Sequence, residues 1–398
     1  MNPGSQVFLY DDARARRAEP FALTRPFSEL RAGGLLGRER WARVLGLQPV
    51  GRLGAAHLAS FAEFDSPPAC DGAGMLPAGA IIINARCAPA LEAIPSAAGR
   101  VRCEGRVAAV RLGAATPAAT FAVGSQSLDD LAADGAEHVA QGWWMDRPWD
   151  LVRHLAAMLL ADIPRLAEGL GGPPAHVTVL GGQSVSVHPT ATVEPFVVCD
   201  TTAGPILIEA GASIAAFTRL VGPCIIGPST QVLGGRVTGS SIGEHCRVHG
   251  ELSASIFVGH ANKGHDGFVG HTILGRWSNL GAGTTTSNLK NTYGSVQAWS
   301  PDGDTDTGMQ FLGSLVGDHA KTAIGTRLTT GAVVGAGANV LETGLTPKVI
   351  VPFAFGGGTY RLDKFLEVAA RVMSRRQVTL TEEHRACLAA AHAARWTA

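Results

Sequence analysis

In the second half of the chain, aliphatic side chains recur at every sixth position. The longest unbroken run is Ile208, Ile214, Leu220, Ile226 and Val232, and shorter groups with this spacing are Val187 and Val193, Ile242 and Val248, Leu274 and Leu280, and Leu328, Val334 and Val340. The period fits neither an α-helix, which repeats every 3.6 residues, nor a half-buried strand, which alternates every two. It is typical of the hexapeptide repeats of a β-helix, in which six residues form one flat side and three sides complete a coil.

Two segments interrupt this repeat. Residues 249–268 depart from the period, and residues 289–311 have the composition of an inserted loop. The repeats of a solenoid build a regular scaffold, so irregular insertions on it often mark the functional face. We therefore expect the chemistry of this region to lie close to these two segments.

A helical tail is expected after the repeat ends near residue 341. The pattern predicts helices at residues 361–375 and 381–395, and Thr379 and Glu382 have the spacing of a capping box at the start of the second helix. Such a tail is expected to cover the end of the β-helix or a neighbouring subunit.

The first half of the chain has a different pattern, of short buried strands and amphipathic helices. We predict strands at residues 5–10, 80–83 and 107–110 and a helix from about residue 150 to 170. The sequence Gly171-Gly172-Pro173-Pro174 then breaks the chain. The expected domains are an α/β domain at 1–149, a connecting helix and linker at 150–175, a β-helix at 176–358 and a helical tail at 359–398.

Composition excludes some classes of function. The formal net charge is zero, so nothing indicates a nucleic-acid partner or an electrostatic membrane anchor. No apolar run reaches the roughly 20 residues that span a bilayer, and the first residues are too charged for a signal peptide. The seven cysteines include no Cys-x-x-Cys pair, which favours free thiols in a reducing compartment. We expect a cytoplasmic protein.

Basic residues crowd one short segment of the first domain. Arg25 and Arg31 precede Gly33-Gly34, and an amphipathic helix expected at residues 35–45 carries further arginines. One interpretation is a solvated helix face with Arg–carboxylate pairs. The other is a phosphate cradle, in which flexible backbone N–H groups and guanidinium forks meet a triphosphate.

The polar segment around His265 is the candidate for chemistry on the β-helix. Lys263 and Asp266 flank this histidine as candidate substrate contacts, and Asn279 and Asn288 follow 14 and 23 residues later. With coils of about 18 residues, these side chains are expected near one edge on adjacent levels. A lone histidine on a repeat is ordinarily structural, but an imidazole also suits deprotonation of an amine that attacks a thioester. Carboxamides suit sugar hydroxyls or an acyl carbonyl.

Three stretches carry a resemblance to a known family. They are LTRPFSELRAGGLLGRERW, NKGHDGFVGHTILGRWSNLGAGTTTSNLKNTYG and GDHAKTAIGTRLTTGAVVGAGANV. The second resembles the acetyltransferase half of the bifunctional glucosamine-1-phosphate acetyltransferase and N-acetylglucosamine-1-phosphate uridyltransferase enzymes. Over residues 5–375 the chain is similar to a divergent bacterial branch of this family, annotated in general terms as sugar nucleotidyltransferases.

The resemblance implies a fold, a site and an assembly. The fold is an α/β nucleotidyltransferase-like domain followed by a left-handed parallel β-helix with C-terminal helices. His265 matches the general base, Asn279 and Asn288 match residues that line the sugar and acyl-donor site, and Ala282 and Ala336 match small residues whose backbone faces acetyl-CoA. The family is trimeric, with each site built between subunits.

The sequence departs from the family at several positions in the β-helix. Phe268 stands where the well-known enzymes carry a tyrosine, and Ser253 stands where they carry a lysine that helps to bind the sugar phosphate. Lys263, Arg236 and Arg247 are the alternatives for that lysine.

The first domain departs further from the family. The usual L-x-x-G-x-G-T-R-M loop is absent, and the residues that resemble it are Thr24, Arg25 and the basic residues after them, including Arg31. Arg25 and Arg31 are therefore the nucleotide-binding candidates. The sequence assigns no magnesium-binding aspartate.

Three functions follow from these observations. The first combines acetyl-CoA-dependent N-acetylation of an amino-sugar 1-phosphate in the β-helix with Mg²⁺-dependent nucleotidyl transfer from a nucleoside triphosphate, expected to be UTP, in the first domain. The second is an acyltransferase whose first domain has lost catalysis and binds or senses a nucleotide sugar. The third is a trimeric β-helix hydratase with zinc held by histidines. The histidines that raise this alternative are His245, His260, His265, His271 and His319.

Overall fold

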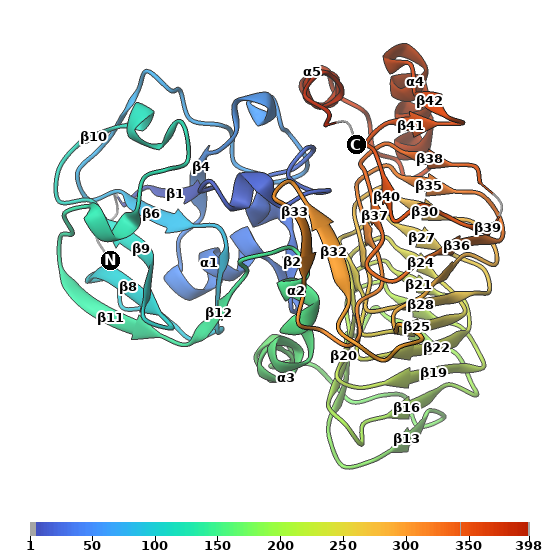
Figure 1. Cartoon of the computed structure of the whole chain (residues 1–398). Coiled ribbons are helices and arrows are strands. Elements are labelled where there is room, and N and C mark those ends of the chain that lie inside the picture. The colour runs from blue at the N-terminus through green and yellow to red at the C-terminus, as the bar shows by residue number, and fades with distance from the viewer. Residues whose placement is uncertain (1–4, 343, 397–398) are drawn as a thin grey trace. The chain divides into compact units, whose positions relative to one another are not determined.

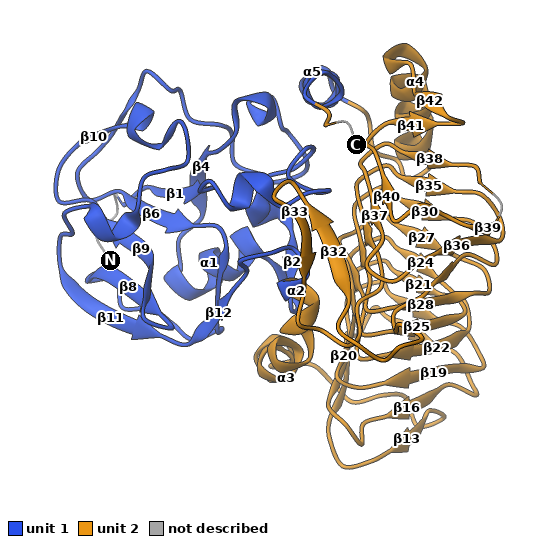
Figure 2. Cartoon of the chain, in the orientation of Figure 1, with its two compact units in different colours: residues 1–150, 381–394 blue, residues 151–380, 395–398 orange. Residues whose placement is uncertain are grey.

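The computed structural model describes residues 5–342 and 344–396, and the chain divides into two compact units (Figure 2). The first unit comprises the residues up to Asp150 together with Thr381–Ala394. The second unit comprises Leu151–Leu380 and the residues from Arg395 onward. Each unit has its own core and is described separately.

A six-stranded mixed sheet forms the centre of the first unit (Figure 1). Its strand order is β11-β8-β9-β6-β1-β4. The strands are β1 (Val7–Tyr10), β4 (Pro49–Leu53), β6 (Ile81–Asn84), β8 (Ala98–Cys103), β9 (Arg106–Arg111) and β11 (Ala136–Ala140). The predicted strands correspond to β1, β6 and β9. Burial explains them, because all four residues of β1 and of β6 are buried, as expected for strands covered on both faces.

Three neighbouring strands of this sheet run parallel, because β1 pairs in parallel with both β4 and β6. Their carboxyl ends therefore meet at one edge of the sheet, which we call the carboxyl edge. Tyr10 is in register with Leu53 on one side and with Asn84 on the other. Open α/β sheets bind ligands outside this edge.

Helix α1 (Gly37–Leu45) covers part of the sheet and confirms the amphipathic helix predicted there. Its start is capped by the Glu39 carboxylate, which accepts a hydrogen bond of 2.9 Å from the Leu36 N–H. Trp41 is fully buried, and its indole donates to the Cys87 carbonyl at 2.8 Å. The buried indole thus has its one donor satisfied, as buried polar groups require.

Helix α5 (Glu382–Ala393) also belongs to the first unit, although it follows the β-helix in the sequence. Its Cys387 packs in a small buried cluster with Leu58 and Phe61. The cap of this helix is Thr381, whose hydroxyl accepts from the His384 N–H at 3.2 Å, rather than the Thr379 of the predicted capping box. The helix expected to cover the β-helix or a neighbour therefore completes the core of the first unit.

The second unit begins within the short helix α2 (Asp150–Arg153) and includes α3 (Leu155–Leu166). It continues into a parallel β-helix with three flat sides. Face 1 is formed by β13 (Thr178–Leu180), β16 (Val198–Asp200), β19 (Thr218–Val221), β22 (Gly235–Thr238), β25 (Glu251–Ser253) and β28 (Phe268–Gly270), with β31 (Thr285–Thr286), β36 (Thr326–Leu328) and β39 (Gly344–Leu345). Face 2 is formed by β14 (Val185–Val187), β17 (Ile206–Ile208), β20 (Cys224–Ile226), β23 (Ser241–Ile242), β26 (Ile256–Phe257), β29 (Ile273–Leu274), β34 (Leu315–Val316), β37 (Val333–Val334) and β40 (Val349–Ile350). Face 3 is formed by β15 (Thr192–Val193), β18 (Ser213–Ile214), β21 (Gln231–Val232), β24 (Arg247–Val248), β27 (Asn262–Lys263), β30 (Asn279–Leu280), β35 (Lys321–Thr322), β38 (Asn339–Val340), β41 (Ala354–Phe355) and β42 (Gly358–Thr359).

The predicted hexapeptide residues form the interior of this prism. Ile208, Ile214, Leu220 and Ile226 are fully buried in one continuous hydrophobic cluster, and Val232 is 1% exposed. Inward-facing aliphatic side chains on every coil stabilise a solenoid in which each coil contacts mainly its neighbours. The predicted fold class is confirmed.

Both predicted interruptions have a structural explanation. The β-helix continues through residues 249–268, but Ile226, Ile242 and Phe257 pair on successive coils, so the coils there shorten to 16 and 15 residues. The insertion after β31 contains a hairpin of β32 (Gln297–Ser300) and β33 (Gly303–Asp306). The first interruption is therefore a change of coil length, and the second is a true insertion.

Helix α4 (Leu362–Ser374) follows the β-helix and packs against its last coils. The ring of Phe365 meets the Phe353 ring edge-on, with ring centroids 4.9 Å apart. At the other end of α4, the Arg376 guanidinium reaches face 3. Among the described residues, none of the helices combines the length and apolarity needed to cross a bilayer.

Candidate active site

His265 lies at the corner between β27 on face 3 and β28 on face 1, and its side chain is exposed. The corner is held from inside by Lys263, which is fully buried. The Lys263 ammonium donates to the backbone carbonyl of His265 and, at 2.8 Å, to that of Asp266. Burial lowers the pKa of Lys263 to about 8. Lys263 therefore fixes the backbone that carries His265 and does not present its charge to a ligand on the surface.

Asp266 ties the same corner to the neighbouring coils. Its carboxylate lies 3.0 Å from His249 Nε2, and its backbone carbonyl accepts a hydrogen bond of 2.8 Å from the Gly283 N–H. The side chain of Asp266 is 91% exposed, so it remains accessible to a ligand.

A cavity of about 420 Å³ on face 3 brings three of the predicted residues together. His265, Asn279 and Ala282 all line it, although they come from two successive coils. Asn279 is in register with Asn262 on one side and Lys321 on the other, which holds its carboxamide on the outer surface of face 3. The cavity therefore combines an accessible imidazole, a carboxamide and a backbone segment without large side chains.

Two predicted residues lie elsewhere in the single chain. Asn288 follows β31 at the far end of face 1, where its Nδ2 donates to His271 Nδ1 at 2.9 Å. Ala336 is fully buried, and its carbonyl accepts a hydrogen bond of 2.8 Å from the Phe353 N–H. Neither residue lines the cavity that contains His265.

The three alternatives for the missing phosphate-binding lysine occupy different places. Lys263 is inside the prism, and Arg236 lies exposed on face 1, in register with Glu251. Arg247 lines the cavity with His265. Of the three alternatives, Arg247 is therefore the one that lies where a ligand of the His265 cavity could contact it.

Four residues of this region were not predicted from the sequence. Arg375, which directly follows α4, lines the same cavity as His265, and so does Asn262. Arg376 and Lys321 line an adjoining cavity of about 230 Å³ together with Asn279. Their signal in the sequence is weak, because a pair of arginines after a helix is ordinarily a favourable interaction with the helix C-terminus.

In the first unit, the two nucleotide-binding candidates are buried. The Arg25 guanidinium lies 3.1 Å from the Glu63 carboxylate and packs over the Phe61 ring. Arg31 donates to the Gly34 carbonyl at 2.5 Å. An Arg–carboxylate pair therefore describes Arg25 better than a phosphate cradle does. The pair is buried, whereas the expected pairs were on a solvated helix face.

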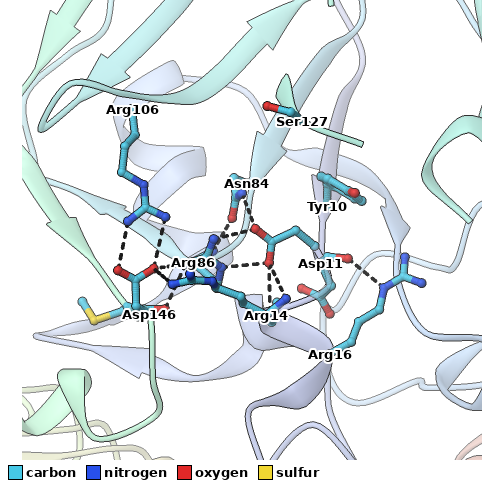
Figure 3. A network of polar contacts seen from close by, with 12 residues as sticks. Tyr10, Asp11, Arg14, Arg16, Asn84, Arg86, Arg106, Ser127 and Asp146 are labelled. Carbon is cyan, nitrogen blue, oxygen red and sulfur yellow. Dashed lines mark hydrogen bonds and ion pairs between the residues drawn. The ribbon is translucent and has the colours of Figure 1, made fainter. Parts of the chain in front are cut away.

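The polar side chains of the carboxyl edge form a network around Arg86 (Figure 3). The guanidinium makes two hydrogen bonds to Asp12, at 2.8 and 2.6 Å, and a third to Asp146 at 2.6 Å. Asn84 donates to Asp12 at 2.9 Å, and Arg106 approaches both oxygens of Asp146 at 3.1 Å. The network joins the ends of β1 and β6 to the segment after β12 (Gly142–Trp144).

Two adjacent aspartates of this network differ in their protonation behaviour. Burial raises the pKa of Asp11 to about 7, because the backbone N–H of Phe27 and distant arginines offset only part of the lost hydration. Burial acts in the same direction on Asp12, but the hydrogen bonds and charge of Arg86 outweigh it, so the pKa of Asp12 lies below its ordinary value.

These carboxylates do not fit a magnesium site in this arrangement. Mg²⁺ takes carboxylate oxygens and water in octahedral geometry, but both oxygens of Asp12 already accept hydrogen bonds from Arg86, and both oxygens of Asp146 face arginines. Among the described residues, no group of three His, Cys, Asp or Glu side chains is placed to hold a metal.

The first unit has a cavity of its own, of about 250 Å³, at the carboxyl end of β4. Small residues dominate its walls, which are formed by Arg52, Leu53, Gly54, Ala55, Ala56, Ala59, Ala69, Cys70, Gly72, Ala118, Phe121 and Ala122. Small walls leave room for a flat ligand, and the position is the one at which open α/β sheets bind nucleotides. This cavity was not predictable from the sequence, because its walls come from three separate segments.

Three of the five histidines of the zinc alternative, His245, His260 and His319, stack with Trp277, whereas His265 and His271 lie apart from them. His245 and His260 have ring centroids 4.9 Å apart, and His260 packs on Trp277 at 4.4 Å. The His260 Nδ1 atom lies 3.0 Å from the Arg276 guanidinium, which also contacts Glu244. These histidine rings therefore pack against their neighbours, and the ring of His260 also forms a hydrogen bond.

Comparison with known proteins agrees with this architecture. Residues 7–170 match the model of a family described as sugar nucleotidyl transferase. The chain is 30% identical over 179 residues to the bifunctional protein GlmU of Jannaschia sp. (strain CCS1), a match that covers 40% of this chain and 36% of GlmU. It is 26% identical over 178 residues to the uncharacterized acetyltransferase YaiX of Escherichia coli (strain K12), covering 42% of this chain and 72% of YaiX.

The comparisons indicate the class of the transferases. These comparisons agree with the resemblance seen in the sequence: residues 7–170 match a sugar nucleotidyl transferase model, and a 179-residue stretch is similar to the bifunctional protein GlmU. The match spans about a third of the length of GlmU.

Proposed function

We propose that the protein is a bifunctional enzyme of sugar-nucleotide biosynthesis. The β-helix transfers an acetyl group from acetyl-CoA to the amine of an amino-sugar 1-phosphate. The first unit transfers a nucleotidyl group from a nucleoside triphosphate, UTP in the simplest case, to the sugar 1-phosphate. The observation that supports acetyl transfer most directly is the cavity that His265, Asn279 and Ala282 line together.

The residues of this cavity have distinct roles in the proposed acetyl transfer. His265 accepts a proton from the amine while the amine nitrogen attacks the thioester carbonyl, and the carbon–sulfur bond then breaks to release CoA as its thiol. Asn279 and Asp266 hold sugar hydroxyls through hydrogen bonds. The backbone beside Ala282 lets the acyl donor approach closely, because no large side chain intervenes.

We propose a homotrimer as the active assembly, because one chain leaves the predicted site incomplete. Asn288 lies at the opposite end of face 1 from His265 and contacts His271. Packing of β-helices side by side would bring Asn288 of the partner subunit toward the His265 corner. The backbone at Ala336 would face acetyl-CoA along the same edge. Sedimentation of the purified protein tests this assembly, and a monomer with full acetyl transfer activity would contradict it.

The support for nucleotidyl transfer is weaker than that for acetyl transfer. The family model covers the first unit, and the small-walled cavity lies at the carboxyl edge, where a nucleotide is expected. The contacts of Arg86 with Asp12 and Asp146 favour a second candidate function, in which this unit binds a nucleotide sugar without transferring it. In that case acetyl transfer is the only reaction of the chain.

Two assays on the same preparation separate these functions. The first measures release of free CoA thiol from acetyl-CoA with a series of amino-sugar 1-phosphates, beginning with glucosamine 1-phosphate. The second measures release of pyrophosphate from UTP and other nucleoside triphosphates with N-acetylglucosamine 1-phosphate, in buffer that contains Mg²⁺. Absence of thiol release with every acceptor would contradict acetyl transfer. Thiol release without pyrophosphate would leave the second candidate function.

The proposed partners are therefore small molecules: a sugar phosphate, a nucleoside triphosphate and acetyl-CoA. We also propose that the protein acts in the cytoplasm. The cysteines support this location, because all seven lie in the described residues as free thiols and six of them are buried.

A further inference from the structure

Three arginines gather on face 3 beside the His265 cavity. Arg375 lines that cavity, the adjoining cavity of about 230 Å³ and a third cavity of about 210 Å³. Arg247 lines the first and third of these cavities, and Arg376 lines the second and third. The described residues that line the three cavities include no aspartate or glutamate.

The positive charge of this cluster is not compensated within the described chain. Across residues 5–342 and 344–396, the guanidinium groups of Arg247 and Arg375 make no hydrogen bond or ion pair with a side chain or carbonyl, and Arg376 contacts the neutral carboxamide of Asn262. Burial, and then the charges of Arg247 and Arg375, lower the pKa of Arg376. Like charges held together in this way destabilise one another, and an anion among them would offset that cost.

A fourth cation, Lys321, lies on face 3 next to Asn279, one coil beyond it. The Lys321 ammonium donates to the His319 carbonyl at 2.9 Å and lines the same cavity as Arg375 and Arg376. Burial lowers the pKa of Lys321 to about 8, so at neutral pH most of this group is charged. The cluster therefore presents four cations to a space of a few hundred Å³.

We propose that Arg247, Arg375 and Arg376, with Lys321 beside them, form a binding site for a phosphoryl group of the reacting molecules. Guanidinium forks match phosphate oxygens in geometry as well as in charge. The site rests on the proposed function, and it supplies the phosphate contact that Ser253 does not make in this chain. The phosphoryl group is that of the amino-sugar 1-phosphate, because Arg247 and Arg375 share their cavity with His265, which takes the proton from the amine of the same sugar.

The test uses isothermal titration of the full-length protein at pH 7 with glucosamine 1-phosphate, glucosamine, CoA and inorganic pyrophosphate. Arg247→Gln and Arg375→Gln are the test variants. Arg371→Gln is the matched control. Arg371 lies on α4, the helix that Arg375 directly follows, but its side chain is 75% exposed and faces Glu367. Loss of one charged contact to a phosphate is expected to weaken binding about tenfold to a hundredfold.

The expected result is that both test variants lose affinity for glucosamine 1-phosphate and pyrophosphate by this factor, while Arg371→Gln binds as the wild type does. Loss of affinity for CoA, with glucosamine 1-phosphate unaffected, would support the phosphoryl site but assign it to the acyl donor. Unchanged affinity for every phosphorylated ligand in both variants, or no binding of any of them by the wild type, would overturn the proposal. The thiol-release assay on the wild type is independent, so failure of acetyl transfer would be seen separately.

Discussion

The Arg376 guanidinium donates a hydrogen bond of 2.6 Å to the side-chain oxygen of Asn262. The bond connects the end of α4 to the middle of face 3, between residues that are 114 positions apart in the sequence. Asn262 is in register with Arg247 on one neighbouring strand and with Asn279 on the other. The end of a helix from outside the repeat thus brings Arg375 and Arg376 to the cavities of face 3.

This contact gives a variant that separates stability from ligand binding. In Asn262→Asp, a carboxylate faces Arg376, so the contact becomes an ion pair and the free energy of unfolding should stay the same or rise by up to about 1 kcal/mol. The added negative charge should weaken pyrophosphate binding about tenfold or more. Chemical denaturation and calorimetric titration measure the two effects. Stronger pyrophosphate binding by this variant would contradict a phosphoryl site on face 3.

His265→Ala tests the assignment of the general base. Removal of a general base is expected to reduce acetyl transfer by about 10² to 10⁴, with the rate of thiol release as the measurement. The side chain is exposed, so the midpoint of thermal unfolding should hardly change. Any nucleotidyl transfer should be intact. An equal loss of both activities would indicate misfolding instead.

Lys321 predicts a pH dependence of anion binding. Its pKa of about 8 in the folded protein means that the ammonium loses its proton as the pH rises through 8. The affinity for pyrophosphate should therefore fall about tenfold between pH 7 and pH 9.5, as one cationic contact is lost. In Lys321→Arg the charge persists over this range, so the decline should be much smaller. Identical profiles for both proteins would show that Lys321 takes no part.

Asp11 predicts a pH dependence of the stability of the first unit. Its folded-state pKa of about 7 lies above that of the unfolded chain, so the folded state binds more protons between pH 4 and pH 7. This contribution to stability is complete below pH 4 and is lost as the pH rises through 7. Asp11→Asn cannot ionise and should exceed the wild type at pH 8 by on the order of 2 kcal/mol. Urea unfolding at pH 5 and pH 8 measures the difference, which should be small at the lower pH.

Arg86→Gln tests the network at the carboxyl edge. The Arg86 side chain is 5% exposed and pairs with Asp12, which is 16% exposed, and with Asp146, which is 39% exposed. Its removal leaves the Asp12 carboxylate without its guanidinium and should cost about 3 kcal/mol of unfolding free energy. Arg102→Gln is the control, because Arg102 also contacts two carboxylates but does so at the surface, where solvent screens the charges. Similar losses in both variants would show that burial does not determine the strength of these contacts.

The β-helix was predictable because its pattern is local and repeats. Every coil needs an aliphatic residue that points inward, so Ile208 or Ile226 carries the same information as its neighbours six residues away. The coil length also predicted His265 and Asn279 near one edge, and both line one cavity, whereas Asn288, predicted there by the same reasoning, lies elsewhere in the single chain. The coil shortens to 15 residues just before this site, which fixed-period reasoning does not anticipate.

Residues whose contacts depend on the way the side chain or the chain folds back were not predictable. Lys263 has the sequence context of a ligand-binding residue, but its long chain folds inward to satisfy the carbonyls of its own corner. Arg375 reaches the cavity only because α4 folds back onto face 3. In the first unit, Arg25 pairs with Glu63, which lies 38 positions further along the chain, and no sequence pattern predicts that pair.

Helix α5 has a consequence for how the protein is made. The ribosome synthesises residues up to Asp150 first, and α5 emerges only after the entire second unit has been translated. Until then Leu58 and Phe61 lack Cys387 as their packing partner, and nascent chains expose apolar surface of this kind to aggregation. The first unit to leave the ribosome is therefore the last to be completed.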